Sequence, residues 1–194
     1  MFPQTLRQAV RLVAIVNLGY FGVEFAVALH IGSVSLFADS IDFLEDASVN
    51  FLILVALAWS ATARARVGMA LAAILLVPGL ATLWMAWTKF TLPIPPSPLP
   101  MTVTGLGALA INLSCAFVLT RFRHHSGSLS HAAFLSARND ALANVAILCA
   151  AGLTAIYPSA WPDLLIGLGI AALNADAART VFRAARREHA EAQP

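Results

Sequence analysis

Six apolar stretches make up most of this sequence, and each is long enough to cross a bilayer as a helix, which takes about 20 mainly apolar residues. They cover residues 8–30, 34–60, 67–89, 101–121, 131–156 and 162–183. Hydrophobic residues make up 59% of the chain and charged residues 11%, whereas a soluble domain carries about 25% charged residues. The sequence therefore predicts an all-α, polytopic membrane protein with six transmembrane helices.

The distribution of arginine predicts the topology. Arginines gather at both ends of the chain and in the second and fourth connections between spans, whereas the opposite side has only Lys89. They are Arg7, Arg11, Arg64, Arg66, Arg121, Arg123, Arg179, Arg183, Arg186 and Arg187. Because cytoplasmic loops are enriched in Lys and Arg, we expect a multi-pass protein of the cell inner (plasma) membrane with both termini in the cytoplasm. We interpret the arginines as topology signals and lipid headgroup contacts, and we do not expect nucleic acid as a partner.

A proline-rich run divides the spans into two groups of three. Pro93-Ile-Pro-Pro-Ser-Pro-Leu-Pro100 cannot continue a helix, and it is predicted to be an external linker. Residues 1–187 are expected to form a single transmembrane domain, and residues 188–194 are expected to form a short cytoplasmic tail. No soluble C-terminal domain is expected.

The second stretch carries four acidic residues, Asp39, Asp42, Glu45 and Asp46. A carboxylate in the hydrocarbon core costs about 2.5–3.5 kcal/mol on insertion scales, so such residues usually serve a proton or ion pathway or a structural ion pair. Few cations in the spans are available for pairing, which favours a pathway. Three of the four acids are spaced i, i+3, i+7 and share one helix stripe, whereas Glu45 lies about 100° round from Asp46.

Asp140 in the fifth stretch is predicted to reach the same depth as the acids of the second. Counted from the outer surface, Asp42 and Asp46 lie about 12–18 Å into a core that is about 30 Å thick. Counted from the inner surface, Asp140 lies about 13–14 Å deep. Ser136, Asp140 and Asn144 are spaced i, i+4, i+8 and share a face.

A short pattern recurs on the two acidic stretches, as Asp46-Ala-Ser-Val-Asn50 and Asp140-Ala-Leu-Ala-Asn144. Each asparagine lies one helical turn beyond its aspartate. One interpretation is a shifted site of Asp46, Asn50, Asp140 and Asn144. The other is that both asparagines hydrogen-bond neighbouring helices, as polar side chains in membrane spans commonly do.

Expected roles can be given to three further charged residues in or beside the spans. Glu24, in the outer half of the first span, is expected either to line an exit path or relay protons, or to make an inter-helix hydrogen bond. Arg138 is expected to face another helix, paired with Glu45 or Asp176, or to reach toward the inner surface. Asp163 begins the last span and is predicted to cap that helix, because a carboxylate is favoured at the N-terminal end of the helix dipole.

These motifs resemble those of the cation diffusion facilitators over nearly the whole chain. The resemblance is carried, in chain order, by Asn17, Glu24, Gly32-Ser-Val-Ser-Leu-Phe-Ala-Asp39, Asp42-x-x-x-Asp46, Ser136-x-x-x-Asp140 and Trp161-Pro-Asp163. It implies a six-helix transporter, usually a homodimer, that exchanges a cytoplasmic divalent metal ion for protons. The metal ligands carried over by the resemblance are Asp42, Asp46, Ser136 and Asp140.

The chain departs from the family pattern in two ways. The fifth-helix pair of the family is often His-x-x-x-Asp or Asp-x-x-x-Asp, whereas this chain has Ser136 at the first position. A neutral hydroxyl is a poor ligand, so water or Asn139 is an alternative occupant of that place. Most members also carry a soluble C-terminal domain that binds metal and helps dimerisation. This chain is expected to be a short form without it, with dimer contacts among the helices.

The expected substrate depends on which argument is used. The site offers mostly carboxylate and hydroxyl oxygens, which suit Mn²⁺, Mg²⁺ or Fe²⁺ better than zinc, whereas much of the family moves zinc. Zinc is the first expectation, with cadmium, iron and manganese open. Accessory metal ligands or proton-path residues are expected among Asp39, Glu45, Asn139, Asn144, Asn50 and Glu24. Residues that could collect metal at the cytoplasmic mouth are His124, His125 and His131, although polar residues at a membrane surface are equally ordinary.

The expected function is proton-coupled efflux of a divalent metal cation by a secondary active transporter, not an enzyme, with no cofactor apart from the metal as substrate. The chain contains no Gly-x-x-x-x-Gly-Lys-Ser/Thr run for ATP, so an ion gradient is the expected energy source. One alternative is a non-transporting membrane subunit whose acids make structural contacts. Another is a passive cation or proton channel.

Overall fold

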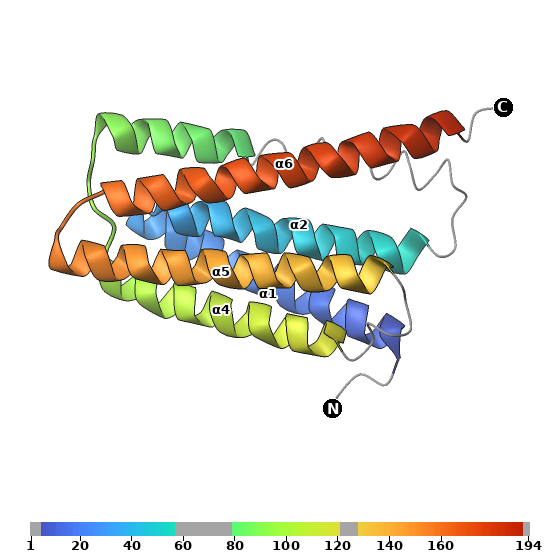
Figure 1. Cartoon of the computed structure of the whole chain (residues 1–194). Coiled ribbons are helices and arrows are strands. Elements are labelled where there is room, and N and C mark those ends of the chain that lie inside the picture. Colours follow the sequence, from blue (N-terminus) through green and yellow to red (C-terminus); the bar gives the residue numbers. More distant parts are fainter. Residues whose placement is uncertain (1–4, 57–78, 121–127, 192–194) are drawn as a thin grey trace.

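The computed structural model describes residues 5–56, 79–120 and 128–191, and within these it leaves the side chains of residues 53, 55, 56, 128–138 and 177–191 undescribed (Figure 1). The described chain is helical almost throughout and contains no strand, which confirms the predicted all-α class. Its helices are α1 (Leu6–Ile31), α2 (Val34–Ala56), a segment at residues 79–91, α4 (Pro98–Thr120), α5 (Ser128–Ile156) and α6 (Trp161–Glu191).

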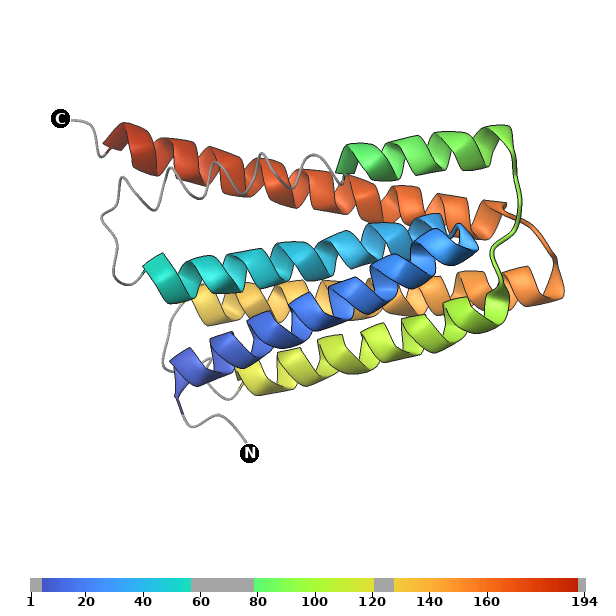
Figure 2. The ribbon, with the colours of Figure 1, turned by 180° about the vertical axis from the view of Figure 1, so that it is seen from behind.

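Four of the helices form a bundle, and two lie together on one side of it. α1 packs against α2 and α4, and α5 packs against α4. α6 packs against α2 and α5, and the helical segment 79–91 lies along the first part of α6 (Figures 1 and 2). α1 begins and α6 ends at the same end of the bundle, as an even number of membrane crossings requires.

The outer surface of the bundle is apolar. Large hydrophobic side chains point away from the neighbouring helices on every element, among them Leu18, Trp84, Leu106, Leu153 and Leu173. Among the described residues, three helices are long and apolar enough to cross a membrane, at Leu6–Ile31, Pro98–Thr120 and Asn139–Ile156. α2 has the length, but its four acidic residues interrupt the apolar sequence. Together these features describe a bundle whose sides face lipid.

The core is centred on α2. Leu36, Phe37 and Ile41 of α2 pack against Met101 of α4 and Ile147 of α5, all of them at most 5% exposed. α1 and α6 complete this cluster. Because side chains on one face of α2 are buried in this way, the acidic stripe on the same helix is also held inside the bundle.

A tight turn joins α1 to α2. Gly32 ends α1 with φ 64°, a left-handed conformation that glycine adopts without steric cost. Ser33 then begins α2 as an N-cap, because its hydroxyl accepts a hydrogen bond from the backbone N–H of Leu36 at 3.2 Å. α1 and α2 are therefore antiparallel neighbours, and the start of α2 is set by two consecutive residues.

Three predicted boundaries differ from the observed helices by three residues or more, and one of them is the start of α5, at Ser128 rather than residue 131. α4 begins at Pro98 rather than residue 101, since prolines are tolerated in the first turn, where backbone N–H groups have no partner within the helix. α6 continues to Glu191 rather than ending at residue 183, and its last part is rich in alanine and arginine, which favour helix. The predicted end of the second span and start of the third, at residues 60 and 67, lie outside the described residues.

Candidate functional site

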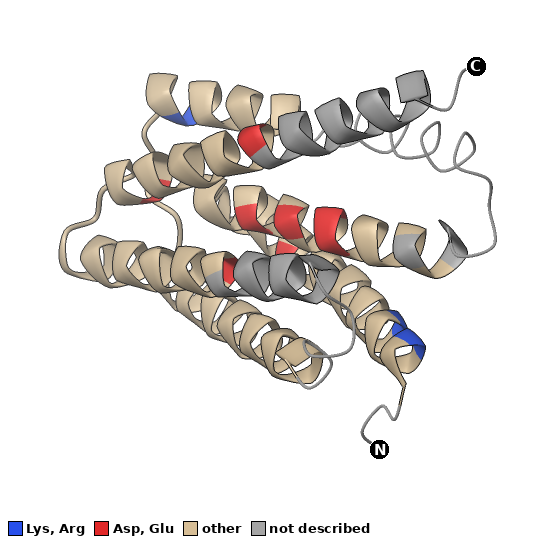
Figure 3. Ribbon diagram, turned by 45° about the vertical axis from the view of Figure 1, so that its right-hand side comes forward, with Lys and Arg blue, Asp and Glu red and all other residues tan. Residues whose placement is uncertain are grey.

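Acidic residues gather at the centre of the bundle, on the middle of α2 and beside it on α5 (Figure 3). Asp39 is completely buried, and Asp42, Glu45 and Asp46 are partly buried. Asp140 of α5 interacts electrostatically with Asp46, Asp39, Glu45 and Asp42. The structure therefore brings the carboxylates of α2 and α5 together at one level.

Asp140 has an unused hydrogen-bonding position. Its Oδ2 atom is buried and has no hydrogen-bond partner, although buried polar atoms nearly always have one. A carboxylate oxygen without a hydrogen-bond donor keeps its lone pairs available to a cation. Asp46, by contrast, accepts a hydrogen bond from the side-chain amide of Asn17 on α1 at 3.4 Å.

The structure describes the side chains of three of the four predicted metal ligands, Asp42, Asp46 and Asp140. In the parts of the chain whose side chains the structure describes, no group of three or more His, Cys, Asp or Glu could hold a metal ion. Asp42, Asp46 and Asp140 interact electrostatically, and their joint role as metal ligands stays a prediction. The fourth predicted ligand, Ser136, lies on α5, but its side chain is outside the described residues.

A chain of polar side chains crosses the bundle beside the acids. Asn112 of α4 donates a hydrogen bond to the side-chain oxygen of Asn144 at 2.9 Å. Asn144 of α5 donates in turn to Oδ2 of Asp39 on α2. All three residues are at most 3% exposed. Asn144 thus hydrogen-bonds neighbouring helices, which was the second interpretation of the repeated Asp-Ala-x-x-Asn pattern. Asn50 instead donates a hydrogen bond within its own helix, to the carbonyl of Asp46 at 2.8 Å.

Glu24 of α1 meets Asp39 from the other side. Its side chain is completely buried, and neither of its oxygens accepts a hydrogen bond from a described donor, which is also true of Oδ1 of Asp39. The two carboxyl groups lie against each other. Since a carboxylate has no hydrogen to donate, two facing carboxyl groups can bond only when one of them holds a proton.

The remaining predicted site residues are more peripheral or lie outside the described part. Glu45 is partly buried and interacts with Asp46, whereas Asn139 is exposed on α5. Predictions for the following residues fall on side chains that the structure does not describe: Arg138, His124, His125 and His131.

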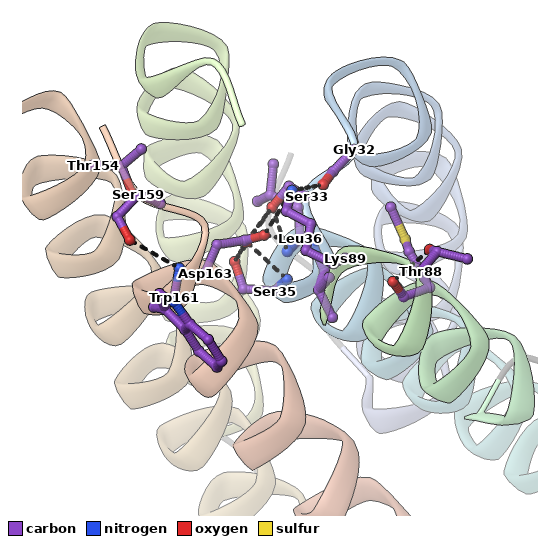
Figure 4. A network of polar contacts seen from close by, with 12 residues as sticks. Gly32, Ser33, Ser35, Leu36, Thr88, Lys89, Thr154, Ser159, Trp161 and Asp163 are labelled. Atoms are coloured by element: carbon purple, nitrogen blue, oxygen red, sulfur yellow. Dashed lines mark hydrogen bonds and ion pairs between the residues drawn. The ribbon is translucent and has the colours of Figure 1, made fainter. Parts of the chain in front are cut away.

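The prediction that Asp163 caps its own helix is wrong. Asp163 lies in the first turn of α6, but its carboxylate accepts hydrogen bonds from the backbone N–H groups of Val34 and Ser35, at 2.9 and 3.0 Å. These are the first residues of α2, so Asp163 caps a helix that is distant in the sequence (Figure 4). The favourable electrostatics at a helix N-terminus apply to α6, as predicted, and also to α2.

Sequence reasoning missed two contributors to the interior. Asn112 was not singled out, although one asparagine in an otherwise apolar span is a signal for an inter-helix hydrogen bond. Tyr20 was also not singled out. It donates a hydrogen bond to the carbonyl of Thr104 at 2.6 Å and packs on Phe43, with ring centroids 5.1 Å apart.

An apolar helical bundle with acids at its centre is the architecture of membrane proteins that move ions. The sequence matches the cation efflux transmembrane domain over residues 10–188 of 194. The chain therefore belongs to the cation efflux family, the cation diffusion facilitators, as the motifs predicted. Members of this family are membrane transporters for cations and not enzymes. A search of curated proteins found no match.

Proposed function

We propose that this protein exports a divalent metal cation from the cytoplasm in exchange for protons. Zinc is the first candidate because of the family, and cadmium, iron and manganese are the others. The observation that carries the proposal is the electrostatic coupling of Asp140 on α5 to Asp42 and Asp46 on α2. Acids are kept inside a membrane protein chiefly for pathways or for ion pairs.

An ion-pair role is poorly supported by the described side chains. Arg7 and Arg11 are exposed near the start of α1, and Lys89 pairs with Asp163 at the opposite end of the bundle. None of these described cations reaches the acids of α2 and α5. The side chain of Arg138 lies outside the described residues, and we propose that the transported metal ion supplies the compensating charge.

The proposed ligands are Asp42, Asp46, Ser136 and Asp140. We propose that the side chains of α2 and α5 close around the ion when it binds. A divalent cation supplies the attraction for that movement, since it replaces repulsion between carboxylates with attraction to a common centre. The unpartnered Oδ2 atom of Asp140 is the position where we expect first contact.

Proton exchange follows from the same group of acids. Carboxyl groups crowded together in a medium of low dielectric cannot all be ionised, so some hold protons when no metal is present. A metal ion displaces those protons from its ligands. On the more acidic side of the membrane, protons displace the metal. We propose that Glu24, Asp39 and Asn144 belong to the proton path rather than to the metal ligands.

Transport also requires the site to open to each side in turn. We propose that the helix pair that bears the site, α2 and α5, rocks against the other helices about the end of α2 that Asp163 holds, in the manner of transporters whose helix groups rock about a central site. We further propose an inner-membrane location with both termini in the cytoplasm, on the arginine distribution, and a homodimer formed through the helices, on the family resemblance.

The test is transport by the purified protein in liposomes, with separate dyes for metal and for pH. We expect metal movement accompanied by proton movement in the opposite direction. Asp46→Ala and Asp140→Ala should each abolish both signals while the protein remains folded. Asp176→Asn, a change of an exposed acid on α6, is the matched control and should transport normally.

Three outcomes would count against the proposal. Metal flux without proton flux would indicate a passive channel. A folded protein that binds none of the metals in calorimetry would indicate a non-transporting subunit. Near-normal transport by Asp46→Ala or Asp140→Ala would exclude these acids as ligands.

A further inference from the structure

The carboxylate of Asp163 is the centre of a buried network at the end of the bundle opposite the chain termini (Figure 4). Besides the two backbone N–H groups at the start of α2, its Oδ1 atom accepts hydrogen bonds from the hydroxyls of Ser33 and Ser35, each at 2.7 Å. Asp163 and both serines are completely buried. Four donors from one short segment therefore converge on a single carboxylate from another helix.

Lys89 adds a third element to this network. Its Nζ atom lies 3.5 Å from Oδ2 of Asp163 and donates a hydrogen bond to the carbonyl of Gly32. Lys89 belongs to the helical segment 79–91, and Gly32 is the last turn residue before α2. The network thus joins α6, the segment 79–91 and the α1–α2 turn.

Close packing surrounds the same point. A Cβ atom on Gly167, one turn after Asp163, would lie only 2.7 Å from the backbone carbon of Val34, so glycine is required for α6 to come this near to α2. Val34, Ala86 and Leu164 form an apolar cluster among the three elements. Polar and apolar contacts therefore fix the same three segments against one another.

We propose that Asp163 is a positioning residue for the metal site, because it sets the height and rotation of α2 through that helix's first turn. The N–H groups of a first turn point along the helix axis. A carboxylate that binds two consecutive N–H groups therefore fixes both the height of the helix along its axis and its rotation about that axis. A helix is stiff, and Asp42 and Asp46 lie about 12 and 18 Å along α2 from Val34. A slide or rotation at Val34 is carried to both. This inference rests on the proposed function.

The test compares Asp163→Ala, Asp163→Asn and Lys89→Met with the unchanged protein. Each is purified, and the Kd for zinc ion is measured by calorimetry, with KM and Vmax measured in liposomes. We expect Asp163→Ala to raise Kd and KM by about 10–100-fold, the usual effect of removing a group that orients metal ligands. Asp163→Asn keeps one oxygen for the donors of Ser33 and Ser35 but turns an NH2 group toward the N–H of Val34, so it should rescue part of the affinity. Lys89→Met leaves the cap in place and should have the smallest effect.

A purely structural role predicts a different result. In that case the yield of folded protein falls, but the folded fraction keeps the unchanged Kd and KM, and this result would overturn the inference. If Asp163→Ala does not fold, Ser35→Ala, which removes one donor and leaves the carboxylate, takes its place with the same criterion. A several-fold rise in Kd supports the inference, and an unchanged Kd overturns it.

A distance measurement separates this inference from the proposed function. Spin labels are placed on the native Cys149, which is exposed on α5, and on Val49→Cys, on the outer face of α2, in a Cys115→Ser background. We expect the distance distribution between the labels to shift or broaden in the Asp163→Ala protein, with or without metal. An unchanged distribution would overturn the positioning role even if transport is confirmed. If the unchanged protein binds no metal, the proposed function fails, and a shifted distance still reports that Asp163 positions α2.

Discussion

The side-chain amide of Asn144 on α5 donates a hydrogen bond to the buried carboxylate of Asp39 on α2. The oxygen of the same amide accepts a hydrogen bond from Asn112 on α4. One asparagine therefore links the acidic helix to two neighbours and gives the carboxylate a donor in a region that water does not reach. This arrangement holds α2, α4 and α5 in register around the candidate site.

Replacing Asn144 with alanine should destabilise the bundle. The change leaves Oδ2 of Asp39 and the amide of Asn112 buried without these partners, and we expect a loss of about 1–2 kcal/mol in the free energy of unfolding, near the upper end for hydrogen bonds in membrane proteins. Asn112→Ala removes only the neutral bond and should cost about 0.6 kcal/mol. Denaturation in detergent, followed by circular dichroism, measures both.

Ser114→Ala is the control for this pair. Its hydroxyl bonds only to the carbonyl of Ala110 on the same helix, and the residue is exposed, so the free energy of unfolding should hardly change. An Asn144→Ala protein as stable as this control would show that the amide bridge contributes nothing to stability.

Replacing Glu24 with glutamine should reduce proton exchange more than metal binding. The change removes a group that can hold a proton against Asp39 but keeps the shape of the side chain. We expect fewer protons to be released per metal bound, slower proton-coupled transport and a Kd for zinc close to that of the unchanged protein. Metal-free protein should also lose the infrared carbonyl band of a buried protonated carboxylic acid.

Calorimetry in buffers of different ionisation enthalpy counts the protons released in this experiment. A Glu24→Gln protein that releases the same number of protons would remove Glu24 from the proton path. If instead zinc binding is lost, Glu24 acts on the metal site itself, and the assignment must change.

Much of the fold could be predicted because apolar sequence length and helix geometry determine it. α1 and α5 end within one residue of the predicted spans, and helix rise predicted that Asp140 of the fifth stretch would lie near the acids of the second, with which it interacts electrostatically. Both predictions use only the length of an apolar stretch and the rise per residue, which can be read from each helix by itself. The predicted helix boundaries at prolines were less accurate, because Pro98 can begin a helix as well as end one.

The partners of the polar side chains could not be predicted in the same way. Asp163 was expected to cap α6, since sequence reasoning considers only the helix to which a residue belongs, yet its partners are about 130 residues away in the sequence. The bridge from Asn112 to Asn144 likewise depends on the rotation of two helices about their axes. Such rotations are set by packing across the whole bundle, which no local pattern records.

Adding a side chain at Gly107 should destabilise the contact between α1 and α4. A Cβ atom there would overlap the hydroxyl of Tyr20 and lie 3.0 Å from its Cζ atom, so Tyr20 would have to leave its hydrogen bond with Thr104. We expect Gly107→Ala to lower the free energy of unfolding by about 1–3 kcal/mol, the usual cost of overpacking. Tyr20→Phe in the same chain should recover part of this loss, because it removes the overlapping atom.

Gly152→Ala serves as the control for Gly107→Ala. No atom lies within 4 Å of a Cβ built at Gly152, and alanine favours helix over glycine by about 1 kcal/mol. The control should therefore be neutral or slightly stabilising in the same denaturation measurement. Equal effects of the two alanine substitutions would show that Tyr20 accommodates the new methyl group without cost.

Replacing Ser136 with histidine should move the metal preference toward zinc. The family pattern often has histidine at this position, and an imidazole nitrogen suits zinc, whereas a site of oxygens alone suits manganese, magnesium or iron. The change should lower the Kd for zinc relative to that for manganese by about tenfold or more, the scale of a ligand contribution. Competition calorimetry with both metals measures the ratio of the two Kd values.

Asn139→His is the matched control. It lies three residues further along α5, at an exposed position, and should leave the ratio unchanged. If Asn139→His shifts the preference and Ser136→His does not, residue 139 supplies the fourth ligand, and the pattern carried over from the family is wrong at this position.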